Sequence, residues 1–191
     1  KAEKADPGRL LKRMIARSGE PVIRKAFNHA MRIMGRQFVM GRTIDEAAER
    51  AKANEEKGYR YSYDMLGEAA RTMEDADRYY KAYEVAIHDI GRVANGRGPI
   101  NSPGISVKLS AIHPRYDFAN YDRVMNELTP RLKQLALLAK KYDIGFTVDA
   151  EEANRLDLSL DVIGAVFADP ELDGWEGYGL AVQAYQKRAY Y

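Results

Sequence analysis

The chain of 191 residues contains no cysteine and only three histidines. The lack of cysteine excludes disulfides, thiolate nucleophiles and cysteine-ligated zinc. Three isolated histidines also argue against a histidine-based metal site, so we predict no metal. A chain without cysteine suits a reducing compartment, and we expect a cytoplasmic protein.

Long apolar runs and a strong excess of one charge are missing too. No stretch approaches the ~18–20 apolar residues of a membrane span, and the charged start at Lys1–Arg13 lacks the apolar core of a signal peptide. Thirty Lys and Arg against 28 Asp and Glu leave a net charge of +2, far from the concentrated basic field that follows a phosphate backbone. We therefore expect no nucleic acid partner for this segment.

Residues 1–57 show helical patterns and no strand pattern. Helices are predicted at Leu10–Ala16 and at Pro21–Val39, the second starting at a proline because the first turn of a helix tolerates its missing N–H. Thr43 followed by Glu46 has the spacing of a capping box, which predicts a third helix. We interpret this part as a helical lead-in segment.

Residues 58–191 alternate short β-like runs with amphipathic helices. The predicted strands are Tyr59–Leu66, Ile105–Ile112, Gly145–Ala150 and Gly179–Tyr185. The predicted helices are Met73–Ala94, Tyr121–Tyr142 and Leu156–Phe167. In the middle helix an apolar stripe recurs at three- and four-residue spacing, formed by Val124, Leu128, Leu132, Leu135 and Ala139.

Helices between successive strands give right-handed βαβ units, and therefore an α/β protein with a parallel sheet. A doubly wound sheet and a (β/α)8 barrel both fit this order. A nucleotide-binding doubly wound sheet would have a glycine-rich turn after its first strand, and Met65–Ala69 is not one. The barrel is therefore the preferred interpretation.

Apolar and polar residues alternate in the predicted strands, and in a barrel the two sets face the outer helices and the lumen. On this parity Leu180 and Val182 pack on helices. Four polar side chains then point into the lumen near the carboxyl ends of the strands, where barrel enzymes keep their active sites. They are Asp64, Lys108, Asp149 and Gln183. A strand-end cap or a structural ion pair explains any one of them equally well, but their shared parity favours a site.

A lysine in the lumen would be costly to desolvate alone, so Lys108 predicts an anion nearby. That anion is Asp149, Asp64 or a substrate carboxylate. A barrel lysine could instead form a Schiff base with a carbonyl substrate. Strand parity does not choose between these alternatives.

Two weaker candidates lie beside the predicted strands. His113 follows the second strand, and a structural role in its loop is preferred over a role in the site. Glu151 and Glu152 extend Asp149 into a carboxylate cluster that could bind a metal. Without histidine or a second acidic cluster on another strand, that alternative is the weaker one.

Four motifs carry a family resemblance: Gly58–Glu68 (GYRYSYDMLGE), Gly104–Tyr116 (GISVKLSAIHPRY), Val148–Ala153 (VDAEEA) and Gln183–Arg188 (QAYQKR). Together they closely resemble the proline dehydrogenase domain of bacterial bifunctional proline utilization A enzymes. The match runs from about Glu20 to Arg188, and motifs this long in this order are highly specific.

The resemblance implies a distorted (β/α)8 TIM-type barrel, FAD on the carboxyl side of its strands, and oxidation of L-proline to Δ1-pyrroline-5-carboxylate in proline catabolism. By this resemblance Asp149 is the catalytic carboxylate beside the flavin and Lys108 is the partner of the proline carboxylate. Glu68 pairs with a substrate-binding arginine late in the barrel, and Gln183 and the backbone at Ala150 contact FAD. Asp64, placed in the lumen by strand parity, is expected in the substrate site as well.

The resemblance also implies partners: L-proline, a quinone or membrane electron acceptor, and an aldehyde dehydrogenase domain in the same polypeptide. The DNA-binding start of some members is expected to be absent. A cytoplasmic location is expected, with a peripheral place at the inner membrane face also open.

Residues 58–191 account for about the first four of eight βα units, so we expect activity and stable folding only together with further strands. Two other functions stay open. One is a barrel lyase that uses Lys108 as a Schiff-base amine. The other is a non-catalytic scaffold or interaction fragment.

Overall fold

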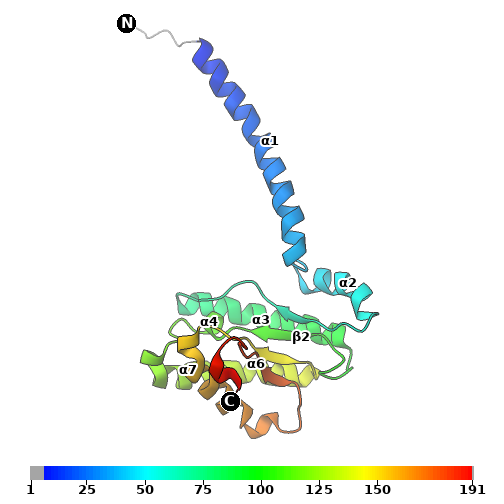
Figure 1. Cartoon of the computed structure of the whole chain (residues 1–191), viewed down its shortest axis with the longest axis vertical. Coiled ribbons are helices and arrows are strands. Elements are labelled where there is room, and N and C mark those ends of the chain that lie inside the picture. The colour runs from blue at the N-terminus through cyan, green and yellow to red at the C-terminus, as the bar shows by residue number, and fades with distance from the viewer. Residues whose placement is uncertain (1–6, 191) are drawn as a thin grey trace. The chain divides into compact units, whose positions relative to one another are not determined.

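The computed structural model describes residues 7–190, and the chain forms two compact units that divide between Arg50 and Ala51 (Figure 1). Each unit is considered by itself. The division predicted from the sequence, a helical lead-in at residues 1–57 and a barrel segment at residues 58–191, remains a prediction.

The first unit is built around α1, one continuous helix at Pro7–Phe38. The prediction of two helices, with Pro21 at the start of the second, was wrong because Pro21 lies inside α1. A proline removes one backbone hydrogen bond and strains one turn, and flanking turns can carry the helix across it. The second helix, α2 at Ile44–Glu55, begins as predicted. The Thr43 hydroxyl accepts the Glu46 N–H (3.2 Å), and the Glu46 carboxylate accepts the N–H of Arg42 (3.0 Å).

The second unit contains a four-stranded sheet in the order β1-β2-β3-β4, and every neighbouring pair is parallel. This confirms the predicted parallel sheet. The strands are β1 at Ser62–Asp64, β2 at Gly104–Val107, β3 at Phe146–Val148 and β4 at Tyr178–Leu180. Each is shorter than its predicted run.

The second predicted strand was wrong at its carboxyl end. Leu109–Ile112 forms a single helical turn, α4, whose four side chains are all buried. In a strand that continued to Ile112, Ser110 would have the parity of Lys108 and face the lumen, but in α4 it is buried together with its apolar neighbours. In the fourth strand the pairing stops at Leu180, five residues before the predicted end at Tyr185.

The helices between the strands follow the sequence pattern closely. Helices α3 at Met73–Ala94 and α7 at Leu156–Phe167 have the predicted limits. The predicted helix at Tyr121–Tyr142 is continuous but not uniform, because α5 (Tyr121–Arg123) leads through a π-helical turn at Val124–Leu128 into α6 (Thr129–Tyr142).

The core lies between the sheet and these helices. Its fully buried members include Ile105, Val107, Phe146 and Val148 from the strands and all five residues of the predicted apolar stripe. The expectation failed at β4, where Leu180 is 41% and Val182 58% exposed instead of packed on helices. Leu180 is the last paired residue of β4, which ends the strand order of the described sheet, and Val182 lies beyond the pairing, where strand parity no longer controls the direction of a side chain.

Candidate functional site

The strand register brings the predicted polar residues to the carboxyl edge of the sheet. Asp64 pairs with Ser106 and Ser106 with Thr147, so these three residues share one level and one face. Lys108 and Asp149 follow Ser106 and Thr147 by two residues and stand one step further along the same face. Asp64, Lys108 and Asp149 thus share a face, with Asp64 one step lower than the other two, whereas Gln183 lies beyond Leu180, the last paired residue of β4.

Lys108 lies between two carboxylates. Its Nζ is 2.8 Å from both carboxylate oxygens of Asp64 and 2.8 Å from Oδ2 of Asp149. The Lys108 side chain is 14% exposed, compared with 50% for Asp64 and 30% for Asp149. The predicted anion near Lys108 is therefore supplied by both aspartates together.

This arrangement fixes the charge of Lys108. Burial alone would lower the pKa of its ammonium group, but hydrogen bonds and charge interactions with Asp149 and Asp64 outweigh burial and raise the pKa above its ordinary value. Lys108 is therefore a permanent cation at neutral pH. A Schiff-base lysine needs a lowered pKa so that the free amine can attack, and the geometry argues against the lyase alternative.

The backbone at the site is held from two sides. The buried hydroxyl of Tyr83, from α3, accepts the N–H of Lys108 (3.2 Å), and burial raises the pKa of Tyr83 to about 12. The N–H of Asp149 donates to the carbonyl of Val107 (2.9 Å), and Oδ1 of Asp149 accepts the N–H of Ala150 (3.0 Å). Sequence reasoning missed Tyr83, because one tyrosine on an apolar helix face carries no signal for its hydroxyl.

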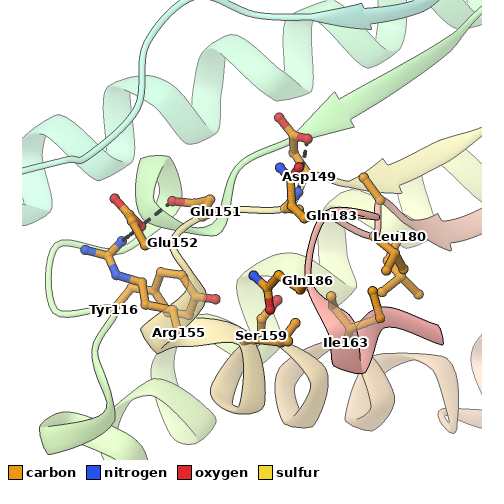
Figure 2. A pocket seen from close by; sticks show the side chains of 15 residues that line it. Tyr116, Asp149, Glu151, Glu152, Arg155, Ser159, Ile163, Leu180, Gln183 and Gln186 are labelled. Atoms are coloured by element: carbon orange, nitrogen blue, oxygen red, sulfur yellow. Dashed lines mark hydrogen bonds and ion pairs between the residues drawn. The ribbon is translucent and has the colours of Figure 1, made fainter. Parts of the chain in front are cut away.

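Glu151 is turned away from Asp149. Figure 2 shows its carboxylate directed toward Arg155, with which it forms an ion pair at 3.6 Å. Its other oxygen accepts the N–H of Ser110 (2.9 Å). Burial raises the pKa of Glu151, although hydrogen bonds from Ser110 oppose that shift. The three neighbouring acids therefore do not converge as metal ligands would.

A shallow cleft, open to solvent, adjoins this edge of the sheet (Figure 2). Its lining combines polar side chains with the exposed apolar surface of Leu180 and Val182. Exposed aliphatic side chains beside a carboxylate and free amides can receive a planar aromatic ligand that has polar edges. The residues therefore fit part of a flavin.

The remaining predicted cofactor and substrate residues fall into two groups. Ala150 and Gln183 line the cleft together with Asp149. The Gln183 side chain is exposed and makes no hydrogen bond within residues 7–190. Glu68 lies on the loop after β1, is exposed, and has no hydrogen-bond or ion-pair partner among the described residues. The structure therefore does not bring Glu68 into contact with Lys108 or Asp149.

His113 is buried in the loop after α4. Its Nδ1 accepts the N–H of Arg115 (3.2 Å), so Nε2 carries the proton that faces Glu127 at 3.1 Å. Both ring nitrogens are thus occupied by groups outside the cleft. This agrees with the preferred structural role of His113.

Within residues 7–190 no helix is long and apolar enough to cross a membrane. The same range holds no group of three or more His, Cys, Asp or Glu side chains placed to bind a metal ion.

Comparisons with known proteins agree with the motifs. The family model for proline dehydrogenase matches residues 47–191. The bifunctional protein PutA of Klebsiella aerogenes is 61% identical over 180 residues, which is 94% of this chain and 14% of that protein. Proline dehydrogenase 1 of Bacillus subtilis is 26% identical over 161 residues, or 84% of this chain and 47% of that protein.

Solved structures give the same result. A proline utilization A (PutA) variant from Bradyrhizobium japonicum is 56% identical with a TM-score of 0.73, covering 93% of this chain and 18% of that one. PutA from Bdellovibrio bacteriovorus, at 21% identity and a TM-score of 0.80 over 88% of this chain and 19% of that one, shares the fold. The expected resemblance and the fold class, a partial TIM-type barrel, are confirmed. The chain spans about 14% of the length of the PutA proteins it matches.

One finding runs against an expectation. A second family model, described as the DNA-binding domain of proline dehydrogenase, matches residues 1–38, so the expected absence of a DNA-binding start is not supported. The expectation rested on the net charge of the whole chain, which is only +2. Residues 1–38 carry ten Lys and Arg and three Asp and Glu, a net charge of +7, while residues 39–191 carry a net charge of −5. The average over the chain conceals the strongly basic character of residues 1–38.

Proposed function

The chain belongs to the proline dehydrogenase family, and from this premise we propose that it supplies the first half of the barrel of a PutA-type flavoenzyme. The proposed reaction is the FAD-dependent oxidation of L-proline to Δ1-pyrroline-5-carboxylate. The observation that carries the proposal is the position of Lys108, a permanent cation held by Asp64 and Asp149 at the carboxyl edge of a parallel sheet, beside an open cleft.

The residues would divide the work between substrate and cofactor. When bound, FAD would accept the hydride from the carbon next to the proline nitrogen. Asp149 pairs with Lys108 and also lines the cleft, so it is placed to contact both ligands. Gln183 and the backbone at Ala150 line the cleft where the flavin would lie, and Leu180 would lose its exposed apolar surface to the ring system.

Charge sets a condition on substrate binding. Lys108, Asp64 and Asp149 together carry a net charge of −1, which by itself does not attract another carboxylate. For Lys108 to hold the proline carboxylate, further cations must face the lumen. The resemblance implies arginines late in the barrel for this purpose, and Glu68, exposed and without a partner in the described residues, is available to pair with one of them.

The partners of the whole enzyme are also part of the proposal. They are an aldehyde dehydrogenase domain in the same polypeptide and a quinone or membrane electron acceptor. Residues 1–38 carry a net charge of +7 and are proposed to bind DNA. In a gel-shift assay with duplex DNA, an affinity that falls steeply with salt would indicate phosphate contacts.

The test uses the purified full-length protein. We expect flavin absorbance, and bleaching of it on anaerobic addition of L-proline. A protein without flavin bands, or with flavin that proline does not reduce, would favour the non-catalytic scaffold. Borohydride trapping of a carbonyl substrate on Lys108 would revive the lyase alternative.

A further inference from the structure

Three loops at the carboxyl edge of the sheet meet at one buried serine. Ser110 is 4% exposed and lies two residues after Lys108 in the chain. Its hydroxyl oxygen accepts the N–H of Ala69 (3.1 Å), and its carbonyl accepts the N–H of Ala70 (2.8 Å). Its own N–H donates to Oε1 of Glu151 (2.9 Å). Ser110 therefore links the loop after β1, the turn after β2 and the loop after β3.

The loop after β1 needs such support. Ala69 has φ +54, in the left-handed region that residues with a Cβ adopt only at a cost in free energy. Both N–H groups that this turn presents, at Ala69 and Ala70, are bound by Ser110. Without these bonds the strained turn would relax, because strain persists only where surrounding contacts hold it.

Each linked loop carries a residue of the candidate site. Glu68 directly precedes Ala69, Lys108 is two residues before Ser110, and Asp149 is two residues before Glu151. Glu68 itself has no partner in the described part of the chain, so its position depends on the backbone of its loop. A contact that fixes the three loops therefore fixes the relative positions of Glu68, Lys108 and Asp149.

We propose that Ser110 is a positioning residue of the enzyme, a three-way latch that fixes the loop of Glu68 relative to the loops that carry Lys108 and Asp149. The role rests on the proposed function, since these residues are placed there as substrate and flavin contacts. Ser110 is not expected to touch proline or flavin, because its hydroxyl, carbonyl and N–H are all committed to the neighbouring loops.

The first test is Ser110→Ala in the full-length flavoprotein. This change removes the hydroxyl, which accepts from Ala69 and also bonds the Glu151 side chain, and it leaves the backbone bonds of residue 110. We expect KM for proline to rise at least about fivefold, the effect of losing one neutral hydrogen bond, with kcat and flavin content little changed. The matched control is Ser102→Ala, since Ser102 is equally buried at the amino end of β2 and its hydroxyl has no partner among the described residues. Equal KM values in the two variants would overturn the proposal.

The third loop is tested at Glu151. Glu151→Gln keeps an oxygen that can accept the Ser110 N–H and is expected to behave like the parent in KM. Glu151→Ala removes that acceptor and is expected to raise KM at least as much as Ser110→Ala. If KM rises as much in Glu151→Gln as in Glu151→Ala, the effect on KM comes from the charge of Glu151 and not from its hydrogen bond to Ser110.

Hydrogen exchange separates this proposal from the proposed reaction. In peptides that contain Ala69 and Ala70, amide exchange should be faster in Ser110→Ala than in the parent, and unchanged in Ser102→Ala, whether or not proline reduces the flavin. Unchanged exchange in Ser110→Ala would sink the latch. If exchange is faster but L-proline does not reduce the flavin of the protein, the role of Ser110 in holding the loops is supported and only the proposed reaction is contradicted.

Discussion

The two edges of the parallel sheet are held together by different forces. At the carboxyl edge Lys108, Asp64 and Asp149 form a charged cluster whose side chains are partly exposed. At the amino edge the backbones approach closely, and a Cβ added to Gly104 would lie 2.7 Å from the carbonyl oxygen of Gly145. The comparison teaches that changes at the carboxyl edge should cost function and changes at the amino edge should cost the fold, as in barrel enzymes generally.

The largest effect is expected from Lys108→Met. Removing the cation leaves Asp64 and Asp149 facing each other without a counter-charge, and loss of a buried charge partner costs about 2–5 kcal/mol of binding. We expect a large rise in KM for proline, with the flavin content of the full-length protein retained. An unchanged KM would remove Lys108 from the site.

Lys133→Met is the matched control for that change. Lys133 is also paired with two carboxylates, those of Asp169 (2.6 Å) and Glu171, but it belongs to α6 and none of the three lines the cleft. Loss of this pairing is expected to leave KM for proline unaltered. A similar rise in KM in both variants would show that the effect of Lys108→Met does not depend on the position of Lys108 at the carboxyl edge.

Gly104→Ala tests the amino edge. The added Cβ meets three backbone atoms of Gly145 within 3.2 Å, and backbone cannot rotate aside as a side chain can. We expect β2 and β3 to be forced apart at a cost of about 1–3 kcal/mol, the usual range for overpacking. Thermal unfolding and soluble yield of the full-length protein measure it.

Gly164→Ala is its counterpart, since Gly164 lies in α7 with nothing within 4 Å of an added Cβ. This change should be neutral or stabilise the protein by up to about 1 kcal/mol, because alanine favours a helix over glycine. If Gly104→Ala melts like Gly164→Ala, close backbone packing is not what holds the amino edge.

Tyr83→Phe tests one hydrogen bond at the carboxyl edge, the one between the Tyr83 hydroxyl and the N–H of Lys108. The variant leaves the N–H of Lys108 without its acceptor, which should cost about 1 kcal/mol and raise KM for proline a few-fold. Tyr142→Phe is the control. Tyr142 is the last residue of α6, next to the amino edge of the sheet, and its hydroxyl is hydrogen-bonded to Nδ1 of His88 in α3. Only the first variant should change KM; a change in both would point to general loosening.

The smallest effect is a pH dependence at the start of α3. Asp75 completes a capping box with Thr72, and its pKa is lowered from 3.8 by hydrogen bonds from Arg78 and then from Thr72. A lowered pKa in the folded state means that the carboxylate stabilises the fold above about pH 4 and that this contribution is lost as the pH falls through the folded-state pKa. In Asp75→Asn the melting temperature should be slightly lower at neutral pH, and the difference should shrink on acidification. A difference that is constant with pH would exclude this linkage.

The sequence was most reliable where one periodic signal extended over many residues. The limits of α3 and α7 and the buried stripe of Val124 and Leu132 were predicted because a helix with one apolar face must bury it against a neighbour. Strand ends were less predictable. Ser110 followed the alternation of β2, yet it lies in the helical turn α4, because burial on all sides gives a strand and a turn the same apolar pattern.

By itself the sequence determined the parallel α/β order, the family motifs, and the placement of Lys108 and Asp149 on one face near the same end of the sheet, since strand parity and βαβ connections are local properties of the chain. Only the tertiary structure decided that Lys108 is shared by Asp64 and Asp149, that Tyr83 holds its backbone, and that Ser110 joins three loops. These contacts span 25 to 44 residues along the chain. Which partner a polar group finds over such a separation depends on the register and packing of whole elements, and no local pattern records it.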